Sequence, residues 1–344
     1  MVNKRDTLDD ILDSLDSLYN EDSSILDGTE SIGTPELLPV DSNLSDVSER
    51  DKPWDIHRAN ADKVRDMYQG TEHDRYAERI KTCSQHLGFI LLSGKEGGTE
   101  FKLHKAKFCR VRLCPVCQWR RSMMWRARFF KVFPKVQEDY PKARYIFLTL
   151  TVRNCPLEEL RDTIKGMNEA WHRLVKRTAF SPVLGWIKSV EVTRSKDGLA
   201  HPHFHIILMV KPSYFSGTGY ISQEKWTELW KDVLRVHYTP VVNVKAIKGK
   251  GDKTSIFSAL CETLKYSVKE SDLTSNTEWL VELTNQLSKT RAVAIGGIFK
   301  SYLSESEPED LIHSDEDEEE RFSYEDEADI WFGWRELVRK YISE

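Results

Sequence analysis

The sequence predicts an α+β protein whose central domain is an antiparallel sheet covered by helices. Between residues 141 and 270, segments rich in aromatic and β-branched residues alternate with segments of helical period. Two of the strand segments are joined by the short run Ser195-Lys196-Asp197-Gly198, which is typical of a hairpin and therefore of antiparallel pairing. We expect no membrane span, because no run of about 18 apolar residues occurs.

The predicted elements of this domain follow the order β-α-β-β-α-β, with one more helix after them. Pro156 favours a helix start just after it, and Ser222 is a typical N-cap residue. In order, the elements are a strand at Tyr145–Val152, a helix at Leu157–Thr178, strands at Trp186–Arg194 and His203–Lys211, a helix at Ser222–Val236, a strand at Pro240–Ile247 and a helix at Ser255–Lys269. This order predicts a ferredoxin-like (RRM-like) sheet, with helices on one face and the other face free for a ligand.

The flanking segments predict a smaller N-terminal module and two acidic tails. The module contains a helix near residues 57–82, a strand at Leu87–Leu92, a loop with cysteines and a long basic helix from about Pro115 to Tyr140. The predicted division of the chain is a disordered acidic tail over residues 1–50, a cysteine-bearing and basic helical region over 51–140, the sheet domain over 141–304, a disordered acidic linker over 305–328 and an aromatic helix over 329–344.

The net charge of −5 hides a strong partition of charge along the chain. Residues 1–50 hold 13 acidic and 3 basic residues, and residues 305–329 hold 14 acidic residues and one basic residue. Residues 51–304 hold 43 basic and 26 acidic residues, a net charge of +17. A basic body of this kind is expected of a protein that binds a polyanion such as nucleic acid. The alternative is a solvated surface that is merely rich in lysine.

The cysteines predict a structural metal site in the N-terminal module. The first residues are acidic and have no apolar h-region, so we expect no signal peptide, and six partly clustered cysteines then indicate metal ligation rather than disulfides. The pattern C-x4-C-x2-C is made by Cys109, Cys114 and Cys117, with Cys83 as the expected fourth thiolate and His86 or His104 as alternatives. Four thiolates form a closed tetrahedral Zn²⁺ site, so residues 51–140 are predicted to bind structural zinc.

A run of histidines in the sheet domain predicts a second metal site of a different kind. His201, His203 and His205 are spaced two apart and lead into an apolar strand. Side chains two apart on a strand point to one face, so His203 and His205 can bind one ion together. His201 is separated from them by Pro202 and is either a third imidazole ligand or a contact to DNA. Such a metal would polarise an oxygen of a phosphate or carbonyl group.

The other arm of the hairpin offers a further ligand. Glu191 lies among β-branched residues on a central strand, where a carboxylate is costly unless it is paired with a cation. The alternative is a solvated glutamate at an edge. A mixed set of nitrogen and oxygen ligands suits Mn²⁺ or Mg²⁺.

The last predicted helix of the domain carries three residues that suit phosphoryl chemistry. Glu262, Tyr266 and Lys269 are spaced to share one helix face. A tyrosine beside a metal-bound phosphate can act as a covalent nucleophile, a glutamate can accept a proton, and a lysine can stabilise negative charge. Alone, this trio is also the pattern of an ordinary solvated helix face.

These motifs together resemble the rolling-circle plasmid replication initiators of the HUH endonuclease superfamily, specifically the single-tyrosine type of small bacterial plasmids. Phe147-Leu148-Thr149-Leu150-Thr151 resembles the first motif of that family, His201-Pro202-His203-Phe204-His205 its metal motif, and Tyr266-Ser267-Val268-Lys269 its nucleophile motif. Glu262 stands where this group carries an acidic residue for termination. The resemblance covers about residues 80–270, and it extends to the cysteines, which relatives often carry before the catalytic domain.

The resemblance implies an enzyme that binds the double-strand origin of a plasmid in the bacterial cytoplasm. Tyr266 would attack a phosphodiester in single-stranded or hairpin DNA, leaving a 5′-phosphotyrosine and a free 3′-OH for a host polymerase, with a host helicase as a further partner. Glu262 would activate water at termination, and strand transfer would reseal the circle. Alternatives are an HUH transposase or mobilisation relaxase, or a non-catalytic zinc-dependent DNA-binding regulator.

A basic helix follows the cysteines and predicts DNA contacts. It carries basic residues interleaved with Trp119 and Trp125, a composition that suits DNA phosphates, although an amphipathic core helix would look similar. The predicted DNA-binding residues are Arg120, Arg121, Arg126 and Arg128, together with Lys265 beside Tyr266.

Overall fold

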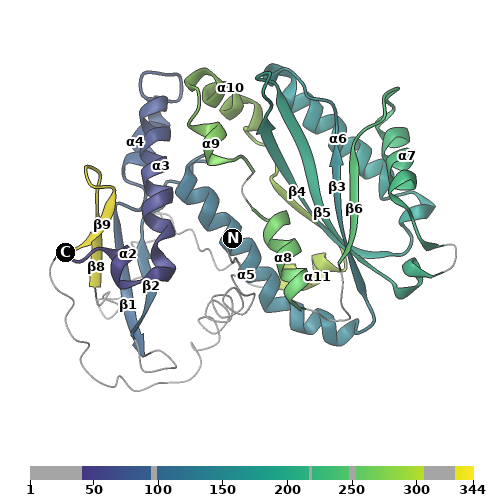
Figure 1. The fold of residues 1–344 in the computed structure, drawn as a ribbon, viewed down its shortest axis with the longest axis horizontal. Coiled ribbons are helices and arrows are strands. Elements are labelled where there is room, and N and C mark those ends of the chain that lie inside the picture. The colour runs from purple at the N-terminus through teal and green to yellow at the C-terminus, as the bar shows by residue number, and fades with distance from the viewer. Residues whose placement is uncertain (1–40, 94–98, 217–218, 248–252, 266, 306–329) are drawn as a thin grey trace, which may run out of the picture. The chain divides into compact units, whose positions relative to one another are not determined.

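The computed structural model describes residues 41–93, 99–216, 219–247, 253–265, 267–305 and 330–344 (Figure 1). The chain divides into two compact units. One, which we call the cysteine unit, runs to Met124 and includes the C-terminal residues from Glu309. The other, the histidine unit, is Trp125–Pro308. Most of the predicted N-terminal tail and nearly all of the predicted acidic linker lie outside the described residues.

The histidine unit contains an antiparallel five-stranded sheet. Its strands are β3 (Arg144–Thr151), β4 (Val183–Arg194), β5 (Ala200–Val210), β6 (Val242–Ile247) and β7 (Val293–Gly297). The strand order is β6-β3-β5-β4-β7. Without β7, which adds to β4, this is the order of a ferredoxin-like sheet, so the predicted fold class is confirmed.

Helices of the histidine unit lie on both faces of this sheet. The connections contribute η3 (Leu157–Glu159), α6 (Leu160–Leu174), η4 (Thr178–Phe180), η5 (Pro212–Phe215) and α7 (Gln223–Leu234), and the later part contributes α8 (Lys253–Thr263), α9 (Glu270–Leu273), α10 (Thr277–Leu287) and α11 (Phe299–Glu305). As predicted, the Ser222 side chain caps α7 by accepting from the Lys225 N–H. Phe204 of β5 packs on Trp230 of α7, so this aromatic side chain points to the α7 face.

The histidine face of the sheet is not free of helices, contrary to the prediction. Phe133 of α5 (Pro115–Asp139) lies between Tyr145 of β3 and Phe257 of α8, with ring centroids 6.0 and 5.7 Å apart. Thr149 pairs directly with His205, so the two side chains share one sheet face. Tyr145 is four residues from Thr149 on β3 and therefore points to that face too. One end of this face is therefore covered by apolar side chains, and His203, His205 and Glu191 lie toward the other end.

The cysteine unit is built around a four-stranded antiparallel sheet in the order β2-β1-β8-β9. Its strands are β1 (His86–Ser93), β2 (Thr99–Ala106), β8 (Ile330–Arg335) and β9 (Lys340–Ser343), and its helices are α2 (Leu44–Val47), η2 (Glu49–Asp51), α3 (Pro53–Tyr68), α4 (Asp74–Lys81) and the first part of α5. The single helix predicted near 57–82 is thus two helices, and Gly70 between them has a φ of +70° that ends the helical path.

The aromatic C-terminal segment is a hairpin, so the prediction of a helix over 329–344 is wrong. Phe332 and Trp334 are two apart and both buried, which is the period of a strand, and β8 pairs with β1 on one side and β9 on the other. The predicted disorder over residues 1–50 also ends too late. Leu44 is fully buried in α2, and Asn43 pairs with Ile342 of β9.

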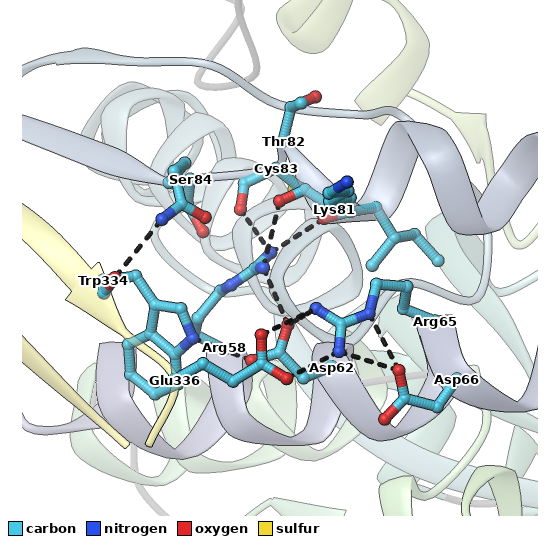
Figure 2. A network of polar contacts seen from close by, with 12 residues as sticks. Arg58, Asp62, Arg65, Asp66, Lys81, Thr82, Cys83, Ser84, Trp334 and Glu336 are labelled. Carbon is cyan, nitrogen blue, oxygen red and sulfur yellow. Dashed lines mark hydrogen bonds and ion pairs between the residues drawn. The ribbon is translucent and has the colours of Figure 1, made fainter. Parts of the chain in front are cut away.

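Polar groups connect this hairpin to α3 (Figure 2). Trp334 Nε1 donates to Asp62 Oδ2 at 2.7 Å, and Arg65 forms an ion pair with Glu336 at 2.7 Å. Arg58, which is 1% exposed, bonds Asp62 and the carbonyl oxygens of Ile80, Lys81 and Cys83. Buried polar groups that are paired in this way favour one arrangement of the hairpin over others. Among the described helices, none combines the length and apolarity needed to cross a membrane.

Candidate functional site

The β4–β5 pair brings a carboxylate and two imidazoles together. Glu191 is the direct cross-strand partner of His203, and His205 lies two residues further along the same face. Glu191 Oε2 is 3.1 Å from His203 Nε2 and 2.8 Å from His205 Nε2. The three side chains are buried and offer ligand atoms within 4.8 Å of one another. This donor set fits a divalent ion held by two nitrogens and one oxygen.

The sheet also orients the ring of His205. Phe147 of β3 stacks on it, with centroids 5.6 Å apart and planes inclined by 21°. Thr149, its direct partner on β3, places Oγ1 3.4 Å from His205 Nδ1. With Nδ1 facing Thr149, Nε2 is the nitrogen that faces Glu191. Contacts to the outer nitrogen of a histidine commonly fix its tautomer and its ligand geometry. Thr149 belongs to the first motif, but no role for it was predicted from the sequence.

Glu191 is held in its charged form by its surroundings. Burial alone would raise its pKa, but hydrogen bonds to His203 and His205 and the charges of His203 and Lys265 outweigh burial and hold the pKa well below its ordinary value. The oxygen of this carboxylate and the two Nε2 atoms lie close enough to surround one ion.

His201 lies beside this group and is turned elsewhere. Its ring is 5.3 Å from that of His203, but its Nδ1 is 2.7 Å from Asn154 Oδ1, and it is not part of the three-residue cluster. Burial and the neighbouring His203 lower the pKa of His201. Asn154, just after β3, was not singled out from the sequence, and its partnership with His201 depends on the tertiary fold.

The segment of the predicted nucleophile passes along the edge of β4. Tyr266 itself lies outside the described residues. On one side of it, Lys265 Nζ is 3.3 Å from Glu191 Oε2 and 2.5 Å from Glu262 Oε1. On the other side, the Ser267 carbonyl accepts from the Val192 N–H at 2.8 Å, and Val268 forms a parallel bridge with Val192.

The single helix expected to carry both Glu262 and Lys269 is therefore not formed. Helix α8 ends at Thr263, because the backbone of Ser267 and Val268 pairs with Val192, in the part of β4 that β7 does not cover, instead of continuing the helix. Glu262 is on the last turn of α8, whereas Lys269 is an exposed residue at the start of α9. The residue that the tertiary structure brings to Glu191 is Lys265, which the sequence placed only among DNA contacts.

The four cysteines of the predicted zinc site come together in the cysteine unit. Cys83, which follows α4, joins Cys109 and Cys114 of the loop and Cys117 in the first turn of α5, and all four are buried. Their sulfur atoms are separated by 3.7 Å (Cys83–Cys117), 3.5 Å (Cys109–Cys117) and 3.8 Å (Cys83–Cys114). Four sulfurs at 2.3 Å from a tetrahedral zinc ion would be about 3.8 Å apart, so the set fits zinc.

The surrounding backbone supports this set. The Cys109 N–H donates to Cys83 Sγ, and Arg79 donates to the Cys109 carbonyl. Burial raises the pKa of Cys83 and Cys114, whereas hydrogen bonds from the other three cysteines lower the pKa of Cys117. Of the alternative fourth ligands, His86 faces Glu344, with 3.0 Å between Nδ1 and Oε2, and neither His86 nor His104 belongs to the cluster.

The arginines predicted to contact DNA make contacts within the protein. Arg121 donates to the carbonyls of Arg110 and Arg112 in the cysteine loop, and Arg120 lies over the Trp54 ring. Arg126 and Arg128 donate to the carbonyls of Cys261 and Leu303. These contacts give the four arginines structural roles, and their contact with DNA stays a prediction.

Comparison with known proteins identifies the family. Residues 100–342 match the model of a family described as "Replication protein". The chain is 36% identical over 295 residues to "Protein rep" of Streptococcus pneumoniae, covering 81% of this chain and 90% of that protein. It is 33% identical over 290 residues to "Protein rep" of Lentilactobacillus hilgardii, covering 80% and 90%, and 32% identical over 324 residues to that of Bacillus amyloliquefaciens, covering 85% and 94%. No solved structure matched. The chain belongs to this replication protein family.

Proposed function

We propose that the protein is a plasmid replication initiator that nicks one strand of its origin through a covalent 5′-phosphotyrosine and rejoins the strand at termination. The observation that carries this proposal is the buried group of Glu191, His203 and His205, with Lys265 and Ser267, on either side of Tyr266, bound to Glu191 and Val192. Membership of a replication protein family supports it independently.

The chemistry follows from the types of residue at this site. The Tyr266 phenol oxygen attacks the phosphorus, the bond from phosphorus to the 3′ oxygen breaks, and the proton lost by the phenol is balanced by the proton gained by the 3′-OH. A divalent ion held by Glu191, His203 and His205 would polarise the phosphate when bound, with Mn²⁺ or Mg²⁺ suited to this donor set. The exposed Lys269 would neutralise charge on the DNA.

Termination requires a second cleavage by water. Glu262 is exposed at the end of α8 and reaches Lys265, which in turn reaches Glu191. A carboxylate in this position can accept a proton from water at the regenerated site.

The released 3′-OH would prime a host polymerase, with a host helicase as partner, in the bacterial cytoplasm where plasmid DNA is copied. The cysteine site would bind structural Zn²⁺.

A covalent adduct is the test of this function. We expect the purified protein, with Mn²⁺ and a single-stranded oligonucleotide from its origin, to give an adduct that persists on a denaturing gel and disappears in Tyr266→Phe. Glu262→Ala should still nick but fail to terminate.

An adduct in Tyr266→Phe would refute the assignment of the nucleophile, and unchanged termination by Glu262→Ala would refute the role of that carboxylate. No adduct with any origin oligonucleotide would favour a non-catalytic DNA-binding regulator, and strand transfer without termination would favour a transposase or relaxase.

A further inference from the structure

The ammonium group of Lys265 lies between two carboxylates with different proposed roles. It is 3.3 Å from Oε2 of Glu191 and 2.5 Å from Oε1 of Glu262. The Glu191 oxygen it approaches is the same one that faces His203 Nε2 and His205 Nε2. Three nitrogen atoms therefore surround one carboxylate oxygen, and one of them belongs to an ammonium group.

A cation at this position opposes the binding of a second cation. Glu191 is 3% exposed, so its interaction with a neighbouring charge is weakly screened by water. A divalent ion bound to Glu191 Oε2 would meet the Lys265 ammonium at close range and would compete with it for the same lone pairs. Glu262 has the opposite effect on metal binding, because its ion pair with Lys265 weakens the interaction of the ammonium with Glu191.

We propose that Lys265 is a positioning residue that tunes the affinity of the Glu191/His203/His205 site for a divalent metal by dividing its ammonium between Glu191 and Glu262. This proposal rests on the metal site proposed above. It links the metal-binding strand to the carboxylate assigned to termination. A substitution at Glu262 should thus change the affinity of the site for a metal to which Glu262 is not a ligand.

Metal affinity, and not activity, is the direct measurement. Zinc-replete, tag-free protein is titrated with MnCl₂, and free Mn²⁺ is measured by electron paramagnetic resonance. Hard Mn²⁺ does not displace zinc from four thiolates, so the titration reports the histidine site. We expect Lys265→Met to bind Mn²⁺ about tenfold more tightly, the effect of removing a partly exposed charge next to a divalent ion. Lys265→Arg should stay close to the unaltered protein.

The opposite sign is expected for Glu262→Gln. Without that carboxylate, the Lys265 ammonium pairs with Glu191 alone, and the affinity for Mn²⁺ should fall. In the double variant Lys265→Met/Glu262→Gln, the Glu262 change should have no further effect, because its influence passes through the lysine. The matched control is Lys225→Met, which breaks an exposed pair with Glu228 of the same i,i+3 spacing on α7 and should leave the affinity unchanged.

The outcomes separate the two proposals. Absence of Mn²⁺ binding by the unaltered protein would refute the metal site and the role of Lys265 together. Binding that Lys265→Met leaves unchanged or weakens, in protein with the unfolding temperature of the Lys225→Met control, would refute the role of Lys265 alone. A fall in affinity on adding Glu262→Gln to Lys265→Met would show that Glu262 acts on the metal directly and would overturn the coupling.

Discussion

Lys188 is a buried cation on the sheet face opposite to the histidines. It is 3% exposed and forms no ion pair with a carboxylate among the described residues. Its Nζ donates to Asn168 Oδ1 at 2.7 Å and lies 3.7 Å from the centre of the Phe204 ring. Burial lowers its pKa to about 7. Phe204 lies between His203 and His205 in the sequence, so this lysine packs behind the strand that carries the site.

The low pKa of Lys188 predicts a dependence of stability on pH. The ordinary pKa of 10.5 applies to the unfolded chain, so the unfolded state binds this proton more strongly. The resulting cost of folding is absent above pH 10.5, grows as the pH falls, and is complete below about pH 7. Relative to Lys188→Met, the unaltered protein should gain roughly 3–5 kcal/mol of stability between pH 7 and pH 10.

Urea unfolding of both proteins across this pH range measures the difference. Lys225→Met, at an exposed site, is the control and should run parallel to the unaltered protein. If the stability of Lys188→Met also changed with pH in parallel with that of the unaltered protein, Lys188 would have to stay charged in the folded state.

At the scale of elements, the C-terminal hairpin completes the sheet of the cysteine unit. Strand β8 lies between β1 and β9, so it pairs along both edges. Its Trp334 is 3% exposed and donates to Asp62, a buried carboxylate that also receives Arg58 and Arg65. Burial raises the pKa of Asp62 more strongly than these partners lower it, which shows how much the site depends on its donors.

Trp334→Phe tests this connection. The substitution keeps an aromatic ring but removes the N–H. The loss of one donor to a buried carboxylate lowers stability by about 1–3 kcal/mol. We expect that loss in the free energy of unfolding of the cysteine unit, measured by chemical denaturation. Trp331→Phe, at a half-exposed position of the same strand, should cost much less. Equal effects of the two substitutions would argue that ring volume, and not the bond to Asp62, matters.

At the scale of the whole molecule, each unit has its own sheet, its own buried side chains and its own cluster of residues that could hold a metal ion. The histidine site is formed within one sheet, whereas the cysteine cluster joins the end of α4, a loop and the start of α5. Structural zinc contributes directly to the folding of small units, because unfolded thiols do not form a tetrahedral site in advance.

Removal of the zinc proposed for the cysteine site should therefore affect the two units unequally. We expect a strong chelator to unfold the cysteine unit while amide protection persists in β3, β4 and β5, as measured by hydrogen exchange. We expect the unaltered protein to contain one zinc ion per chain, and Cys117→Ser to contain less and to reproduce the effect of the chelator. Simultaneous loss of protection in both units would contradict their independence, and full protection in the cysteine unit without zinc would refute a structural role for the metal.

The sequence by itself determined the β-α-β-β-α-β order that starts the histidine unit, but not β7, α10 or α11, and it predicted the two sets of residues that the structure brings together as possible metal ligands. Local signals carry this information, since the alternation of His203, Phe204 and His205 assigns faces on any strand and the spacing of Cys109, Cys114 and Cys117 brings sulfurs together in any tight loop. Hairpin pairing was enough to predict Glu191 as the partner of these histidines. These predictions depend on neighbours in the chain or across one turn.

Only the tertiary structure decided the features that depend on pairing between distant segments. Residues 330–344 have an aromatic composition that suits either period, and the edge of β1 selects the strand. Helix α8 ends early because Val192 of β4 bonds the Ser267 carbonyl and forms a bridge with Val268, and this turn places Lys265, not Lys269, beside Glu191. A free sheet edge satisfies backbone groups that the local sequence would otherwise leave in a helix, and no local pattern encodes where such an edge lies.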